Sequence, residues 1–78
     1  MALKFHGKDP NNPGDTCPAV FRDEQTGDFY FQGETVIDPE LLARISTDSR
    51  LLDTESVVKL PPSMIDIILE ACSAKVDH

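Results

Sequence analysis

The sequence has no long apolar run, few basic side chains, and only isolated cysteines and histidines. No window approaches the ~20 consecutive apolar residues of a membrane span, and residues 1–8 contain no apolar stretch long enough for a secretory signal. We therefore expect a cytoplasmic protein with no membrane association. In that compartment, two cysteines favour free thiols over a disulfide.

Basic residues are scarce, with 7 Lys and Arg against 14 Asp and Glu, giving a net charge of -7. Nucleic-acid affinity comes mainly from Lys and Arg side chains that neutralise phosphates. We therefore expect no nucleic-acid partner. An acidic surface either keeps a small protein soluble or steers a basic protein partner towards it.

Metal-binding and catalytic motifs are also missing. The candidate ligands Cys17, Cys72, His6 and His78 are all far apart, whereas zinc sites are typically built from closely spaced ligand pairs. The chain has no nucleophile elbow and no glycine-rich phosphate loop. We expect no enzyme activity, catalytic residue, metal or cofactor. Two alternatives stay open: a redox or metal-responsive sensor using Cys17 and Cys72, and a small enzyme or enzyme subunit.

The composition predicts one folded domain. The chain has 78 residues, of which 40% are hydrophobic and 27% charged, which suits a globular protein too short for a second core. Residues 7–16 are rich in proline, glycine and polar side chains. We therefore predict a flexible N-terminal leader over residues 1–16 and a single α+β domain over residues 17–78.

The first pattern in that domain is a hairpin. Residues 19–23 and 28–32 flank a turn over 24–27, in which Gly27 suits the left-handed position. Because side chains alternate along a strand, Phe29 and Phe31 are predicted on a buried face and Tyr30 on a solvated one.

Two helices and a third strand are predicted after the hairpin. Asp38 is a typical helix cap before Pro39, so a helix is expected over residues 39–46. Its apolar side chains are expected to pack on the sheet: Leu41, Leu42 and Ile45. Residues 56–60 read as a third strand that stops at two prolines, and Ser63 with Asp66 resembles a capping box for a second helix. The predicted order is ββαβα, with both helices on one face of a three-stranded sheet.

The second helix is unusually apolar. At about 100° per residue, its apolar side chains cover roughly 200°, whereas a surface helix needs a stripe of little more than ~100°. The first helix and the leader could cover the excess. Alternatively, part of the arc is a partner-docking face or a homodimer seam. For that case we predict these partner-binding residues: Met64, Ile65, Ile67, Ile68, Leu69 and Cys72.

Four short motifs carry a resemblance to a known group of proteins. Cys17–Val20, Phe31–Gly33, Asp38–Leu41 and Val58–Pro61 give a Cys-Pro, Gln-Gly, Asp-Pro-Glu-Leu and Val-x-x-Pro pattern over about residues 17–62. This pattern resembles small uncharacterised actinobacterial proteins. Members often occur beside helix-turn-helix regulators, so the resemblance implies an accessory regulatory role. It supplies no catalytic residues.

These observations favour a non-enzymatic, acidic protein-interaction module. The partner would be another protein, and a basic transcriptional regulator is the class that the charge and the resemblance together suggest. Self-association as a homodimer is the other form of interaction that the apolar helix allows.

Overall fold

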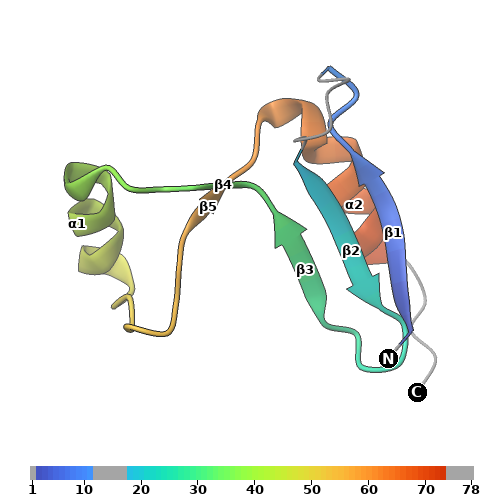
Figure 1. Cartoon of the computed structure of the whole chain (residues 1–78), viewed down its shortest axis with the longest axis horizontal. Helices are drawn as coiled ribbons and strands as arrows, with labels where there is room; N and C mark the ends of the chain where they lie inside the picture. The colour runs from blue at the N-terminus through green and yellow to red at the C-terminus, as the bar shows by residue number, and fades with distance from the viewer. Residues whose placement is uncertain (1, 12–17, 74–78) are drawn as a thin grey trace.

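The computed structural model describes residues 2–11 and 18–73 (Figure 1). Its elements follow in the order β1 (Leu3–Lys8), β2 (Ala19–Asp23), β3 (Phe29–Gln32), β4 (Glu34–Thr35), α1 (Pro39–Asp48), β5 (Val58–Lys59), η1 (Pro62–Met64) and α2 (Ile65–Ser73). The predicted α+β class is confirmed. The arrangement of strands and helices differs from the predicted ββαβα order in several places.

The main sheet has three antiparallel strands in the order β1-β2-β3. The predicted hairpin over β2 and β3 is present, and Gly27 has the positive φ of 83° that its turn requires. The third strand is β1, which pairs with β2 and shifts register at a bulge between Phe5 and Gly7. Residues 3–8 are therefore a strand of the main sheet, in contrast to the predicted flexible leader over residues 1–16. Residues 12–17 lie outside the described part.

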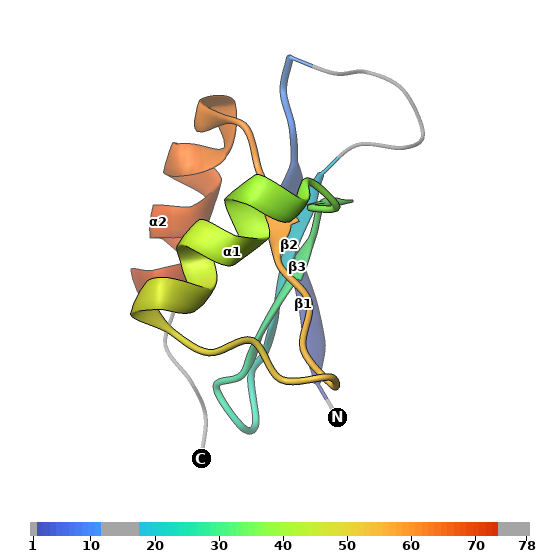
Figure 2. The same ribbon diagram turned by 90° about the vertical axis from the view of Figure 1, so that its left-hand side faces the viewer.

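One helix, α2, covers one face of this sheet and forms the core (Figure 2). Val20, Met64 and Ala71 are buried, and Leu60, Ile67 and Ile68 pack around them half-buried. Gly7 lets α2 approach β1 closely, because a Cβ atom there would lie only 3.2 Å from the Ile67 side chain. Burial of this small cluster between helix and strand provides most of the apolar stabilisation.

Two buried carboxylates connect separate parts of this body. Asp23 accepts hydrogen bonds from the backbone amides of Gln25 at 2.8 Å and Thr26 at 3.3 Å, which closes the β2–β3 turn. Asp9 accepts a 2.6 Å hydrogen bond from the Ser63 hydroxyl and so joins the residue after β1 to η1. Ser63 therefore lies inside η1 and does not form the predicted cap of α2.

The segment between β3 and α2 forms an arm that projects from the body (Figure 1). β4 and β5 pair into a two-stranded ribbon, so the predicted third strand pairs with β4 and lies outside the main sheet. Gly33 is required at the ribbon's base, since a Cβ atom there would lie 2.7 Å from the Lys59 carbonyl oxygen. The ribbon leads into α1 at the far end of the arm.

Helix α1 begins as predicted, but it does not pack on the sheet. Asp38 caps it by accepting a 3.0 Å hydrogen bond from the Glu40 amide, and Pro39 occupies the first turn. None of its residues is buried, and it makes at most marginal contact with any other helix or strand. The prediction of two helices on one sheet face is therefore wrong: within the described residues, α2 covers that face without α1.

The core makes a direct stability prediction. Replacing Met64, which has no exposed surface, in the variant Met64→Ala should lower the free energy of unfolding by about 2–5 kcal/mol, because it removes buried methylene groups and leaves a cavity. Urea denaturation monitored by circular dichroism measures the change. Leu52→Ala, at a side chain that is 48% exposed, is the control and should cost well under half as much.

The turn carboxylate makes a pH prediction. The backbone amide of Gln25 is the largest influence that holds the pKa of Asp23 below its ordinary value of 3.8, with further lowering by the Thr26 amide. A lowered pKa in the folded state means that Asp23 stabilises fully above its unfolded pKa and loses this contribution as the pH falls through the folded pKa. Asp23→Asn should therefore remove part of the acid destabilisation seen in urea unfolding across a pH series. Asp28→Asn, at an exposed carboxylate in the same turn, should remove less; an equal effect would contradict this role for Asp23.

Candidate interaction surface

The six residues predicted to bind a partner divide into buried and exposed groups. Met64 is fully buried and makes the core, so its assignment to a binding face is corrected. Ile67 and Ile68 are half-buried against that core. The exposed members are Ile65 at 55%, Leu69 at 61%, and Cys72. The wide apolar arc of α2 is therefore only partly used by the fold.

The exposed members lie on one flank of α2. Ile67 faces Gly7 of β1, which identifies the side of the helix that looks towards β1. At about 100° per residue, Cys72, Ile65 and Leu69 fall on the opposite flank, which looks towards β3. The charged residues of the helix, Asp66 and Glu70, fall on the β1 side, so the β3 side is apolar.

Strand β3 adds two aromatic rings next to this flank. Phe31 and Phe29 pair with Val20 and Arg22 of β2, so they share the face that carries α2. Their rings stack with centroids 6.0 Å apart. Phe29 is 39% and Phe31 is 43% exposed, because α2 lies over β1 and β2 and makes little contact with β3.

Arg22 fixes the boundary between these rings and the helix. Its guanidinium lies 4.4 Å from the centroid of the Phe29 ring and donates a 2.8 Å hydrogen bond to the Ala71 carbonyl oxygen. The cation therefore stacks on the aromatic ring and also stabilises the last turn of α2. Rings and helix are thereby held in a fixed relation.

Together the strand and the helix form an apolar corner. We define the corner as the floor made by β3 and the wall made by the exposed flank of α2, with these residues: Phe29, Phe31, Ile65, Leu69 and Cys72. The apolar arc of the second helix predicts the wall, whereas the alternation of β3 predicts the floor as buried core. An alternating strand pattern tells which side chains share a face, but it does not tell how far a helix extends over them.

A second apolar area lies on the opposite face of the sheet, which no helix of the described residues covers (Figure 2). Phe5 and Phe21 pair across β1 and β2 with ring centroids 5.3 Å apart, and Tyr30 is opposite Phe21 on β3. Phe5 is 54% and Tyr30 45% exposed. The prediction that Tyr30 lies on a solvated face is confirmed.

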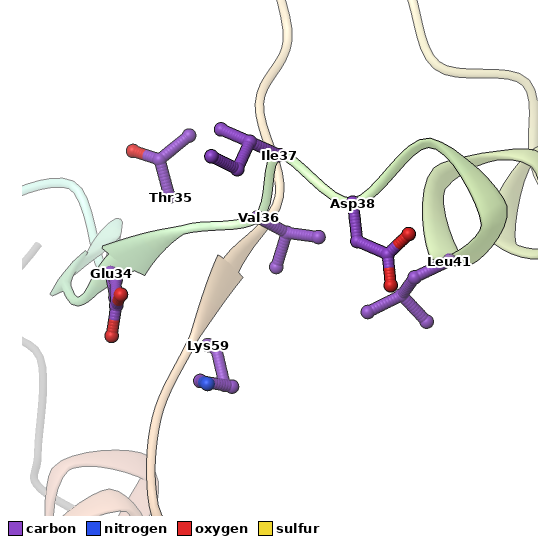
Figure 3. A pocket seen from close by; sticks show the side chains of 7 residues that line it. All are labelled: Glu34, Thr35, Val36, Ile37, Asp38, Leu41 and Lys59. Carbon is purple, nitrogen blue, oxygen red and sulfur yellow. The ribbon is translucent and has the colours of Figure 1, made fainter.

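A shallow hollow of about 250 Å³ lies at the base of the arm (Figure 3). Val36 and Leu41 give it apolar walls, and Glu34 on β4 lies directly across from Lys59 on β5. Thr35, Ile37 and Asp38 also line the hollow, and Ile37 is 84% exposed. The hollow therefore mixes apolar and charged groups.

Two of the four residues considered for metal or redox chemistry, His6 and Cys72, lie in the described part of the chain. Within residues 2–11 and 18–73, no three His, Cys, Asp or Glu side chains are close enough to share a metal ion. Cys72 is a free, exposed thiol, while Cys17 and His78 lie outside the described residues. The part of the chain described also contains no helix that is long and apolar enough to cross a membrane.

Comparison with models of protein families, with curated proteins and with solved structures finds no match to this chain. The resemblance to small actinobacterial proteins therefore stays a prediction.

The wall of the corner can be tested by thiol chemistry. In a Cys17→Ser background, Cys72 should react with a thiol reagent in dilute, native protein, because its side chain is exposed. The matched control moves the thiol by one residue, with Ala71→Cys and Cys72→Ser in the same background. Ala71 is buried, so that thiol should react only when the chain unfolds. Equal rates at the two positions would contradict the orientation of α2.

Proposed function

We propose that this chain is a non-enzymatic, acidic protein-interaction module that binds another protein through the apolar corner. The observation that carries the proposal is the exposure of five apolar side chains from two elements that are held in one place. Contiguous exposed apolar surface on a small protein usually marks an interaction site. Aromatic side chains such as Phe29 and Phe31 are typical of the central part of such sites.

The fold supports a binding role for these residues in a second way. The exposed side chains of Ile65 and Leu69 contribute nothing to the core. Polar side chains at both positions would keep the protein more soluble, so their apolar character favours a binding role. Burial against a partner would recover apolar free energy of roughly 25 cal/mol per Å² before the costs of association. Apolar contacts would therefore supply most of the affinity.

The charge of the chain suggests the class of a foreign partner. A net charge of -7 attracts basic proteins over a distance of about one Debye length and raises the rate of encounter. A basic transcriptional regulator fits this charge, and it also fits the accessory role that the resemblance implies. Such a complex would weaken as salt increases.

The experiment is capture from a lysate of the source cells with the tagged chain, at low and high salt, followed by mass spectrometry. Leu69→Glu places a charge in the corner and should abolish recovery of a partner, because an unpaired charge is costly to bury. Ser73→Glu adds the same charge on the outward side of the same helix and should leave recovery unchanged.

Three results would count against the proposal. One is that no foreign protein is enriched at either salt concentration. The second is that the captured protein is acidic and insensitive to salt, which would remove the electrostatic part. The third is that Leu69→Glu and Ser73→Glu reduce capture equally, which would place the binding surface outside the corner.

A further inference from the structure

The corner has the geometry of an unfilled helix site. Its floor is the bare half of the sheet over β3, and its wall is the apolar flank of α2. Two helices that pack side by side on a sheet lie 8–10 Å apart, which is about the width of two strands at their ~4.8 Å spacing. A second helix placed beside α2 would therefore lie over β3 and cover Phe29 and Phe31.

The chain itself contains a helix that matches this site. The apolar side chains of α1 fall within an arc of about 100° on one side of the helix, and they are Leu41, Leu42 and Ile45. None of the three is buried: Leu41 is 43% exposed, and Leu42 and Ile45 are half-buried. The apolar stripe that predicted packing on a sheet has no sheet to pack on within its own chain.

The ribbon at the base of the arm keeps α1 away from its own corner (Figure 1). Pairing of β4 with β5 extends to a 2.8 Å hydrogen bond from the Val36 amide to the Val57 carbonyl. Only Ile37 and Asp38 separate this paired backbone from the start of α1. Returning α1 to its own β3 would require the ribbon to separate.

The exposed surface of the chain agrees with a missing neighbour. A folded monomer of 8.6 kDa exposes about 4,700 Å², whereas this chain exposes 5923 Å². The excess is about 1,200 Å² over all 78 residues, and the exposed corner and the projecting arm both contribute to it.

We propose that the apolar corner is filled by α1 of a second copy of this chain, with the two arms exchanged reciprocally. The inference rests on the proposed function in using the same apolar corner, so a foreign partner would bind there by displacing the exchanged α1. A two-fold axis makes both contacts equivalent, so that each chain gives one helix and receives one. The aromatic face of the sheet that carries Phe5 and Tyr30 stays open in such a dimer.

Charge gives this dimer a distinctive salt dependence. Each copy carries a net charge of -7, so two copies repel each other, and salt screens that repulsion. The dimer should therefore become tighter as salt increases. A complex with a basic partner has the opposite dependence, so the two kinds of association can be told apart in one titration.

The test is sedimentation velocity over about a hundredfold range of protein concentration, at low and high salt. Leu41→Glu alters the helix that is given, and Leu69→Glu alters the corner that receives it. Each alone should weaken the dimer by at least about tenfold, because the interface would bury an unpaired charge. Ala43→Glu and Ser73→Glu add the same charge to the outer sides of α1 and α2, and both should dimerise like the wild type.

Mixing the two disruptive variants tests the exchange itself. The Leu69→Glu chain keeps an intact α1, and the Leu41→Glu chain keeps an intact corner. An equal mixture should associate more strongly than either variant alone, because the mixed dimer has one unaltered contact. Cys72, in a Cys17→Ser background, should react with a thiol reagent more slowly as protein concentration rises.

Several results would overturn the inference. The first is a wild-type chain that stays monomeric at every concentration, and the second is a mixture no more associated than its components. The third is a dimer that dissociates as salt rises. The fourth is a Cys72 reaction rate that is slow but independent of protein concentration, as expected if α1 folds back onto its own chain. A strict monomer that still captures a foreign protein through Leu69 would reject the exchange and retain the proposed function. A dimer with no foreign partner would support the exchange and reject the basic-partner proposal.

Discussion

The contact between α2 and the middle of the sheet holds this protein together. Met64 of η1 and Ala71 of α2 pack with Val20, and Ile67 lies close to Gly7, so the buried apolar cluster joins η1 and α2 to two strands. A core this small gives a 78-residue chain little stability in reserve. Everything else in the structure is arranged around this contact or projects away from it.

That arrangement explains why apolar surface is left exposed. Because α2 lies over β1 and β2, it leaves β3 bare and turns its own second flank outward. Arg22 then fixes the exposed rings relative to the end of the helix, through its contacts with Phe29 and Ala71. The corner is thus a product of where the core contact happens to lie, and its residues come from segments nearly forty positions apart.

Local sequence signals predicted the elements better than their partners. The hairpin turn at Gly27 and the helix cap at Asp38 were predicted because each depends on neighbouring residues. The alternation of β3 correctly placed Phe29 and Phe31 together on one face. Local signals do not predict which strands pair over long distances in the sequence. They therefore assign β1 to a leader and β5 to the main sheet. Proline and glycine at residues 7–16 describe the loop after β1, and they obscured the strand before it.

The candidate surface was predicted in part for the same reason. The arc of α2 indicated more apolar surface than one strand pair can cover, and the exposure of Ile65 and Leu69 agrees with that indication. Met64 cannot be separated from them by periodicity alone, because it lies within the same arc and its burial depends on its contact with Val20. Predicting that the floor of the corner is exposed would require knowing that α1 does not pack on the sheet.

The short ribbon of β4 and β5 separates two parts of the chain whose residues differ in how freely they can be substituted. Residues of α1 contribute no buried side chain to the body, so they are free to change without cost to folding. Gly33, at the point where the ribbon leaves the sheet, has no such freedom, because any larger residue would collide with the Lys59 backbone. The core therefore places no restriction on α1, whereas the proposed exchange would require its apolar stripe to keep matching the corner.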